Sequence, residues 1–213
     1  KAFADTVRLR LGYQTATYHG FSGTVALEGT SFLVADDFNS TANGKTQFPV
    51  IAAPNAYELD LAYLSYAPNE NGKFNLGRQR IMIDNQRFFG NVGWRQNEQT
   101  FVAIDLNYKF GKNFVVRYYY INRVQRVFGA ENPNEDLYRW NLNLNLFHAD
   151  YSYGPSKFTG YAYLNENETL PQTSQKNFGV RYVFNKTTSN GMGWLGTAEY
   201  AKQDSYADGA SKI

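Results

Sequence analysis

Apolar and polar residues alternate without interruption between positions 138 and 146. The apolar set is Tyr138, Trp140, Leu142, Leu144 and Leu146, and the polar set is Arg139, Asn141, Asn143 and Asn145. Successive side chains of a β-strand point to opposite faces, so the alternation predicts a strand with one oily face and one wet face. Aromatic and leucine side chains backed by Arg and Asn are typical of a transmembrane barrel strand, with lipid on the first face and a water-filled lumen on the second.

The same period of two, with many aromatic and β-branched residues, recurs along the chain. Examples are Val7 and Leu9 against Arg8 and Arg10, and Leu59 and Leu61 against Glu58 and Asp60. The pattern predicts ten strands and no helix; the strands are expected at residues 5–15, 21–32, 57–66, 73–81, 100–110, 114–124, 137–152, 157–164, 177–184 and 193–203.

Short and long connections alternate between these strands. The short ones fall at 17–20, 68–72, 111–113, 154–156 and 185–192, and the long ones at 34–56, 82–99, 125–136 and 165–176. An up-and-down meander gives this regularity when its turns lie on two different sides of a membrane. We therefore predict an all-β fold, an antiparallel up-and-down transmembrane β-barrel that forms a single domain over residues 1–213.

An open meander has two unpaired edges, which a bilayer does not tolerate, so the complete barrel must close. The C-terminal residues Asp208 to Ile213 lack the aromatic final residue usual in bacterial barrels, and no secretory signal is visible at Lys1 to Asp5. We expect the chain to be part of a larger barrel of roughly 16–18 strands, with both ends of the barrel missing.

Composition narrows the function classes. The mean hydropathy of −0.52 is neutral evidence, because every second residue of a barrel strand faces water. Cysteine is absent, which excludes a disulfide scaffold, a Cys-based metal site and a thiol nucleophile. A net charge of +2 argues against a nucleic-acid partner. The two histidines, His19 and His148, have no recognisable Ser or metal context, so we expect neither an enzyme nor a cofactor.

The segment from Leu76 to Phe101 is rich in Arg, Asn and Gln. It resembles the alginate export family of Gram-negative outer-membrane porins, above all at residues 76–80, 84–90 and 93–101, and weaker similarity spans most of the chain. The resemblance implies an outer-membrane location, a single-chain barrel and an electropositive constriction rich in Arg. Family members similar to the namesake pass an anionic uronate polysaccharide outward.

Arginine carries a permanent charge and a planar fork that matches a carboxylate, so a lumen lined by Arg attracts and orients carboxylated solutes. We predict Arg78, Arg80, Arg87 and Arg95 at the constriction, Arg8, Arg10, Arg117 and Arg139 on the lumen walls, and Asp84, Glu98, Glu58 and Asp60 as pore carboxylates. The alternative is structural: these arginines pair with the same carboxylates and Glu28 and hold an in-folded loop. A bulge near Gly77 would move Arg78 to the face opposite Leu76.

The connection 82–99 combines Arg, Asn and Gln with aromatic residues, and we expect it to fold into the barrel and narrow the passage. The leading hypothesis is a passive outer-membrane channel for anionic solutes such as alginate, other acidic saccharides or small anions, with membrane lipid as its other partner. A plugged structural or ligand-binding barrel that acts through its extracellular loops is the alternative. A soluble lipocalin-like binder comes third. The sequence leaves the oligomeric state open.

Overall fold

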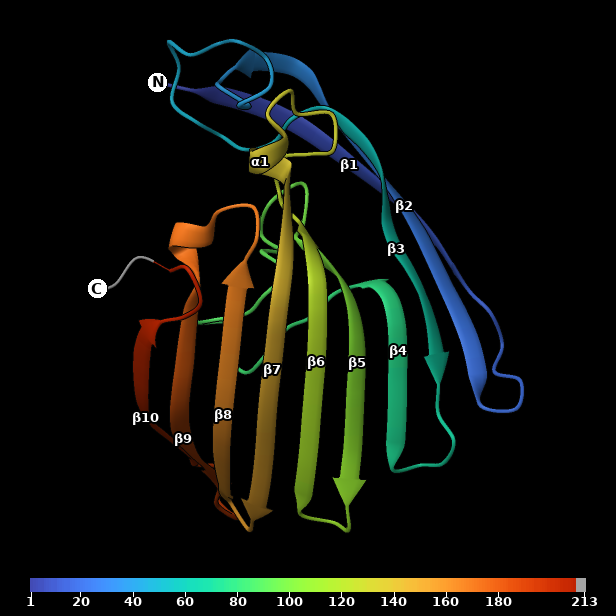
Figure 1. Ribbon diagram of the computed structural model, residues 1–213, viewed down its shortest axis with the longest axis vertical. Coiled ribbons are helices and arrows are strands. Elements are labelled where there is room, and N and C mark those ends of the chain that lie inside the picture. Colours follow the sequence, from blue (N-terminus) through green and yellow to red (C-terminus); the bar gives the residue numbers. More distant parts are fainter. Residues whose placement is uncertain (210–213) are drawn as a thin grey trace. The chain divides into compact units, whose positions relative to one another are not determined.

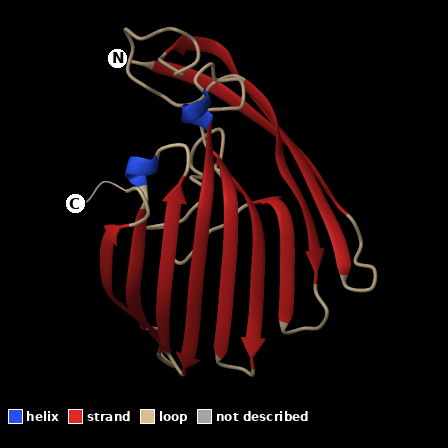
Figure 2. Cartoon of the chain, viewed as in Figure 1, coloured by secondary structure: helices blue, strands red, loops and turns tan. Residues whose placement is uncertain are grey.

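The computed structural model describes residues 1–209, and its regular secondary structure consists almost entirely of strands (Figures 1 and 2). The ten strands form one sheet in chain order, from β1 to β10. The elements are β1 Phe3–Gln14, β2 Phe21–Asp37, β3 Ala56–Tyr66, β4 Gly72–Gln79, β5 Thr100–Phe110, β6 Phe114–Gln125, α1 Glu135–Tyr138, β7 Arg139–Tyr153, β8 Ser156–Asn167, η1 Pro171–Thr173, β9 Gln175–Thr187 and β10 Gly193–Ser205. All ten predicted strands are confirmed, and so is the all-β up-and-down architecture.

The connections confirm the predicted alternation of lengths. The short ones are 15–20, 67–71, 111–113, 154–155 and 188–192, and the long ones are 38–55, 80–99, 126–138 and 168–174. The expectation that no helix forms was wrong, because two of the long connections each contain a single helical turn, α1 and η1. Asn134 caps α1 by accepting a hydrogen bond from the main-chain N–H of Asp136, and Pro171 begins η1. None of the described helices is long and apolar enough to cross a membrane.

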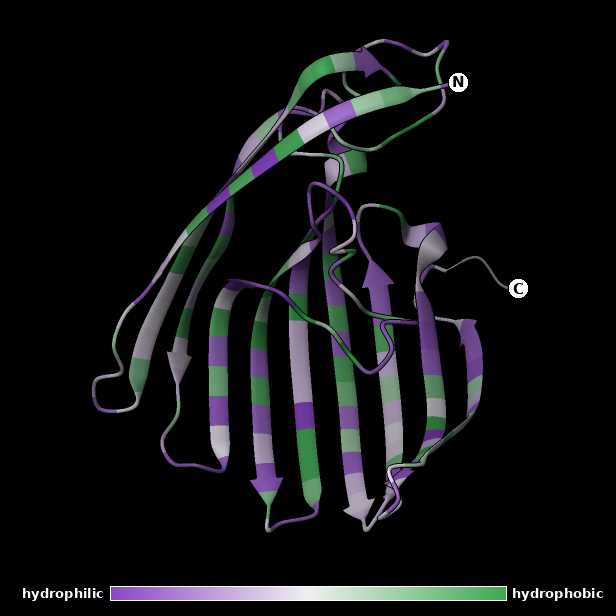
Figure 3. Cartoon of the chain, turned by 180° about the vertical axis from the view of Figure 1, so that it is seen from behind, coloured by the Kyte–Doolittle hydropathy of each residue, from purple (hydrophilic) through white to green (hydrophobic). Residues whose placement is uncertain are grey.

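The chain divides into two compact units. The first unit comprises Lys1–Tyr66, Asn75–Ala103 and Ile121–Asn141, and the second comprises Ala67–Phe74, Ile104–Tyr120 and Leu142–Ile213. Residues 210–213 lie outside the described residues. They belong to the C-terminal segment 208–213, from which we predicted that the end of the barrel is missing. Bands of polar and apolar residues alternate along the strands of both units (Figure 3).

In the first unit, β1 has the two faces that its sequence predicts. Val7, Leu9 and Leu11 are exposed, with 44%, 63% and 65% of their surface accessible, and they lie on the side opposite Arg10. β1 pairs antiparallel with β2, so that Leu9 lies across from Gly29 and Arg10 across from Glu28. One face of this sheet is therefore apolar and open, and the other carries the charged side chains.

The predicted face of β3 changes half-way along the strand. Leu27 pairs with Leu59 and its neighbour Ala26 pairs with Leu61, so Asp60 is an extra residue that forms a β-bulge. Beyond a bulge the two faces exchange, because the side-chain period is two. Leu59 is exposed as predicted, but Leu61 is buried, which corrects its assignment to the face of Leu59.

A second irregularity lies at Gly77 in β4, where the backbone has a φ of +130°. Leu76 before it is exposed, and Arg78 after it pairs with Glu58 on the charged face. The regular alternation is interrupted between these two residues, as the sequence suggested. Glycine is required here because an added Cβ would lie 2.3 Å from the carbonyl oxygen of Ala62.

In the second unit, the orientation predicted for residues 142–146 is wrong. Leu142, Leu144 and Leu146 are buried, and the same face of β7 continues into His148 and Asp150. The asparagine face continues into Phe147 and Tyr151, which are exposed. Alternation alone does not say which face is outward. The ionisable side chains farther along β7 decide it. Asp150 has to reach its cationic partners on the polar side, and the leucines share the strand face of Asp150, so they lie on that side too.

We predict that Gly77→Ala lowers the free energy of unfolding by at least about 2 kcal/mol, because it combines an unfavourable φ with a backbone clash. Urea titration of the refolded protein in detergent, followed by Trp fluorescence, measures the change. Gly160→Ala in β8 is the control, since a Cβ there meets nothing within 4 Å. Equal loss of stability in the two variants would contradict the assignment.

Candidate functional site

Five charged side chains meet on the polar face of the first unit, and we call them the Glu98 cluster. They are Arg10 of β1, Glu28 of β2, Asp60 of β3, and Arg80 and Glu98 of the connection 80–99. Arg10 lies 3.0 Å from Asp60 and 2.5 Å from Glu98, and it also pairs with Glu28. Arg80 lies 2.8 Å from Asp60 and pairs with Glu98.

The cluster has more carboxylates than cations. Glu28, Asp60 and Glu98 are all buried, with 4%, 2% and 5% of their surface accessible. Their carboxylate oxygens lie within 4.8 Å of one another, a spacing that could hold a metal ion. The two guanidinium groups already supply the positive charge that these buried carboxylates require. The arrangement therefore fits an ion-pair network better than a metal site.

Glu98 is held ionised by its neighbours. Burial raises the pKa of Glu98, but the guanidinium groups of Arg80 and Arg10 and the side-chain amide of Asn91 outweigh burial and lower it below the ordinary value of 4.5. The Asn91 amide donates a hydrogen bond of 2.6 Å to the second carboxylate oxygen. All these contacts favour the charged form of Glu98.

A separate ion pair lies beside the cluster. Arg78 donates to Glu58 at 2.6 Å, and its Nε donates to the hydroxyl of Thr100 at 2.7 Å. This pair joins β4 to β3 and β5. The structure therefore brings six of the predicted site residues into paired arrangements, namely Arg10, Arg78, Arg80, Glu58, Asp60 and Glu98.

The connection 80–99 folds back onto the polar face of the first three strands. Arg8 donates to the main-chain carbonyls of Arg95 and Gln96 at 3.2 and 3.0 Å. Thr30 of β2 donates to the side chain of Asn97 at 3.0 Å. Residues 95–98 of the connection are thus tied to the strands by ion pairs and hydrogen bonds. Whether it narrows a pore remains a prediction.

Three predicted site residues of this connection lie apart from the Glu98 cluster. The guanidinium carbon of Arg87 lies 5.4 Å from the ring centre of Phe88, and that of Arg95 lies 4.3 Å from the ring centre of Trp94. Asp84 occupies a left-handed turn with a φ of +50°. The two arginines are placed for cation–π contacts with the neighbouring ring, which sequence spacing did not reveal.

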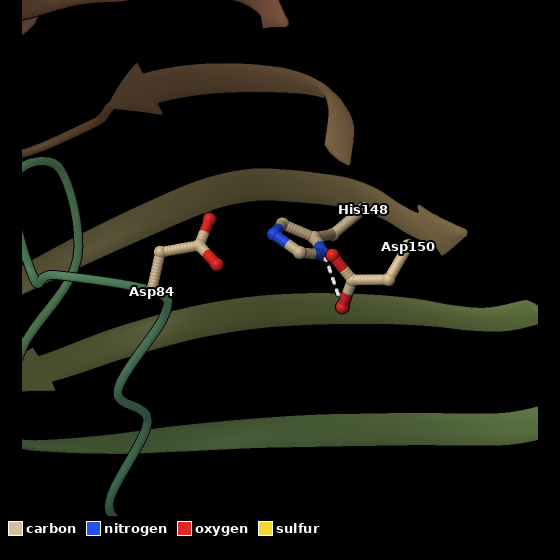
Figure 4. A group of neighbouring side chains, drawn as sticks. All are labelled: Asp84, His148 and Asp150. Atoms are coloured by element: carbon tan, nitrogen blue, oxygen red, sulfur yellow. Dashed lines mark ion pairs between the residues drawn. The ribbon is translucent and has the colours of Figure 1, made fainter. Parts of the chain in front are cut away.

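A second group, the Asp150 cluster, lies in the second unit and consists of Arg117, His148, Asp150, Lys157 and Thr159. Asp150 accepts from Arg117 at 2.5 Å and from Thr159 at 2.6 Å, and Lys157 lies 3.0 Å away. The Nδ1 atom of His148 lies 3.8 Å from Asp150 (Figure 4). The same atom lies 3.3 Å from Arg117. Sequence reasoning named Arg117 and missed its partners. The spacing of His148 and Asp150, two residues apart on one strand face, was the available signal.

Arg139, predicted on the lumen wall, lies in the first unit, whereas Arg117 lies in the second. Arg139 begins β7 and pairs with Glu135 of α1, and its guanidinium carbon lies 5.9 Å from the ring centre of Tyr138. Its place on the lumen wall stays a prediction.

The sequence comparisons found no match, either to a protein-family model or to a curated protein. The fold, in contrast, matches solved outer-membrane porins. OccAB2 of Acinetobacter baumannii superposes with a TM-score of 0.70 at 13% identity, covering 98% of this chain and 53% of that one. OpdK of Pseudomonas aeruginosa, solved with vanillate, gives 0.68 at 8% identity, with coverages of 96% and 54%. OccD3 (OpdP) of P. aeruginosa gives 0.64 at 13%, with coverages of 95% and 44%.

The chain has the strand fold of these Occ and Opd porins. It spans about half the length of the solved chains that it matches. These structures are not alginate exporters by name, so the likeness supports a porin fold and leaves the resemblance to the alginate export family as a prediction.

We predict an acid-driven release of the connection 80–99. Because the pKa of Glu98 is lowered in the folded protein, its stabilising effect is complete above about pH 4.5 and is lost as the pH falls through the lowered value. Emission from Trp94, measured with Trp140 and Trp194 changed to Phe, reports the release. The change of Trp94 emission with falling pH should be absent in Glu98→Gln, although Glu28 and Asp60 still titrate in that variant. An acid step of equal size with and without Glu98 would contradict the prediction.

Proposed function

We propose that the protein is a passive channel in the outer membrane of a Gram-negative bacterium and that it passes small anionic solutes. The observation that carries the proposal is the pairing of a porin fold with a two-faced sheet, apolar and exposed on one side and lined with arginine on the other. In this proposal the protein has no catalytic role and needs no cofactor or energy source.

The apolar face supports contact with membrane lipid. Leu9, Leu11 and Tyr13 of β1 and Leu27 of β2 are more than half exposed. Exposing a continuous apolar surface to water is unfavourable, whereas a bilayer satisfies it. Tyr153 and Trp194 lie near strand ends in the second unit, where amphipathic rings suit the headgroup level.

The polar face supports the choice of an anionic solute. Arg8, Arg10, Arg78 and Arg80 lie on the polar side of the first unit, and Arg117 lies in the Asp150 cluster of the second. A guanidinium fork binds a carboxylate through two parallel hydrogen bonds. OpdK, a solved porin of similar fold, was crystallised with vanillate, which carries a carboxylate. Uronates and other acidic saccharides have the same group, and alginate is a polymer of them.

We predict that the full-length protein in a planar bilayer conducts with a reversal potential on the anion side under a salt gradient. Glucuronate on one side should reduce the chloride current, because it competes for the arginines, whereas glucose at the same concentration should not. A cation-side reversal potential would contradict anion preference, and equal effects of the two sugars would contradict carboxylate recognition.

A plugged barrel is the second candidate, and the attachment of the connection 80–99 to the polar face favours it. That connection is tied down by ion pairs to buried carboxylates, and a fixed segment on the inner side of a barrel closes the lumen. In a plugged barrel the extracellular loops would do the work.

Removal of residues 84–95 separates the two candidates. In the channel proposal the wild type conducts and the deletion raises the conductance, because the passage widens. In the plugged barrel the wild type does not conduct and the deletion opens it. Single-channel recording measures both proteins. An unchanged conductance in a protein that already conducts would show that the connection does not narrow the pore.

A further inference from the structure

Glu98 differs from the other two carboxylates of the Glu98 cluster in where it is attached. Glu28 and Asp60 belong to β2 and β3, whereas Glu98 belongs to the connection 80–99. One of its carboxylate oxygens contacts both Arg10 and Arg80. A strand carboxylate is held by the sheet. Arg80 directly follows β4, so Glu98 can leave both arginines if the far end of the connection, residues 91–99, moves. It is therefore the removable counterion of the cluster.

We propose that Glu98 acts as an internal substitute for the solute: it occupies Arg10 and Arg80 in the empty channel, and an anionic solute binds by displacing it. This inference rests on the proposed channel function and adds a specificity-determining residue to it. A solute without a carboxylate or a similar anion cannot take over the bonds of Glu98 and leaves the connection in place.

The charge balance of the cluster supports displacement over simple addition. Arg10 and Arg80 are shared among three buried carboxylates, so neither guanidinium group lacks a partner while Glu98 is present. A further anion finds no unpaired guanidinium group in the cluster. When Glu98 leaves, Arg10 and Arg80 face only Glu28 and Asp60 and the charges are equal, so one solute carboxylate can replace Glu98 without raising the negative charge.

The bonds that are broken and formed in this exchange are of one kind. Both Glu98 and the solute accept charge-assisted hydrogen bonds from the same two guanidinium groups. What the solute must overcome is the remaining attachment of the connection. It includes the bonds from Arg8 to two carbonyls, from Thr30 to Asn97 and from Gln96 to the hydroxyl of Thr6. These contacts set how readily Glu98 is released.

Asn91 makes Glu98 move together with its connection. The Asn91 side chain donates to Glu98 at 2.6 Å, and the Asn91 carbonyl accepts from the main-chain N–H of Gln99 at 2.6 Å. The carboxylate is therefore fixed within the local fold of residues 91–99. Displacement of Glu98 shifts this segment rather than a single side chain, so solute binding and movement of the connection are one event.

The test compares Glu98→Gln with Glu58→Gln. Both substitutions remove one negative charge from the polar face of the first unit. Glu58 is the control because it lies on β3 and pairs with Arg78, whereas Glu98 lies on the connection. Glucuronate block of the chloride current is measured for the full-length wild type and both variants. Loss of the internal competitor should lower the half-blocking concentration of Glu98→Gln about tenfold, with a much smaller shift for Glu58→Gln. No shift in Glu98→Gln, or equal shifts in the two variants, would overturn the proposal.

A protein that carries no current would refute the channel function, and the exchange of Glu98 for an anion at Arg10 and Arg80 is then tested by binding alone. In that case glucuronate binding is followed through the emission of Trp94, which lies in the moving segment, again with the other two Trp residues replaced. A saturable change that tightens about tenfold in Glu98→Gln supports displacement. An emission that does not respond to glucuronate contradicts it.

A disulfide provides an independent check, since the chain has no cysteine of its own. Thr30 and Asn97 are both buried and their side chains are 3.0 Å apart, so Thr30→Cys with Asn97→Cys can lock the connection to β2. The oxidised protein should lose glucuronate block, and a reductant should restore it. Block at an unchanged glucuronate concentration in the locked protein would overturn the proposal.

Discussion

The structure of the first unit depends on the pairing of buried carboxylates with arginine. An ionised carboxylate without a partner is strongly disfavoured away from water, so Asp60 and Glu98 require Arg10 and Arg80. The same pairs cross from β1 to β3 and from the strands to the connection 80–99. One electrostatic requirement thus fixes both the polar face of the sheet and the position of the segment that lies over it.

A backbone irregularity makes part of this pairing possible. The positive φ of Gly77 interrupts the alternation of β4, so that Arg78 reaches Glu58 on the polar face. In regular strands Leu76 and Arg78 would share a face, and either an arginine would enter the apolar side or a leucine the polar side. Local departures from the ideal strand therefore serve the charge arrangement.

The sequence predicted the strands and the connection lengths because both depend on local properties, namely a period of two and turn-forming residues. It did not predict the orientation of β7, since alternation of leucine and asparagine is the same whichever face is outward. The outward face is decided by the contact of Asp150 with Arg117, which lies on another strand. The candidate site was predicted as a set of charged residues, but which arginine meets which carboxylate depends on register and bulges that are set by the whole sheet.

A polar face that is neutralised by ion pairs can still select anions. Bare arginines would attract any anion over a long range, subject to screening by salt, and would be costly to bury in the empty protein. Arginines that are already paired avoid that cost, and they respond only to a group that can replace their partner. In the proposed exchange, selectivity depends on the replacement of one carboxylate by another and not on net charge. The modest net charge of +2 is consistent with such a mechanism, because recognition by exchange needs no electropositive surface.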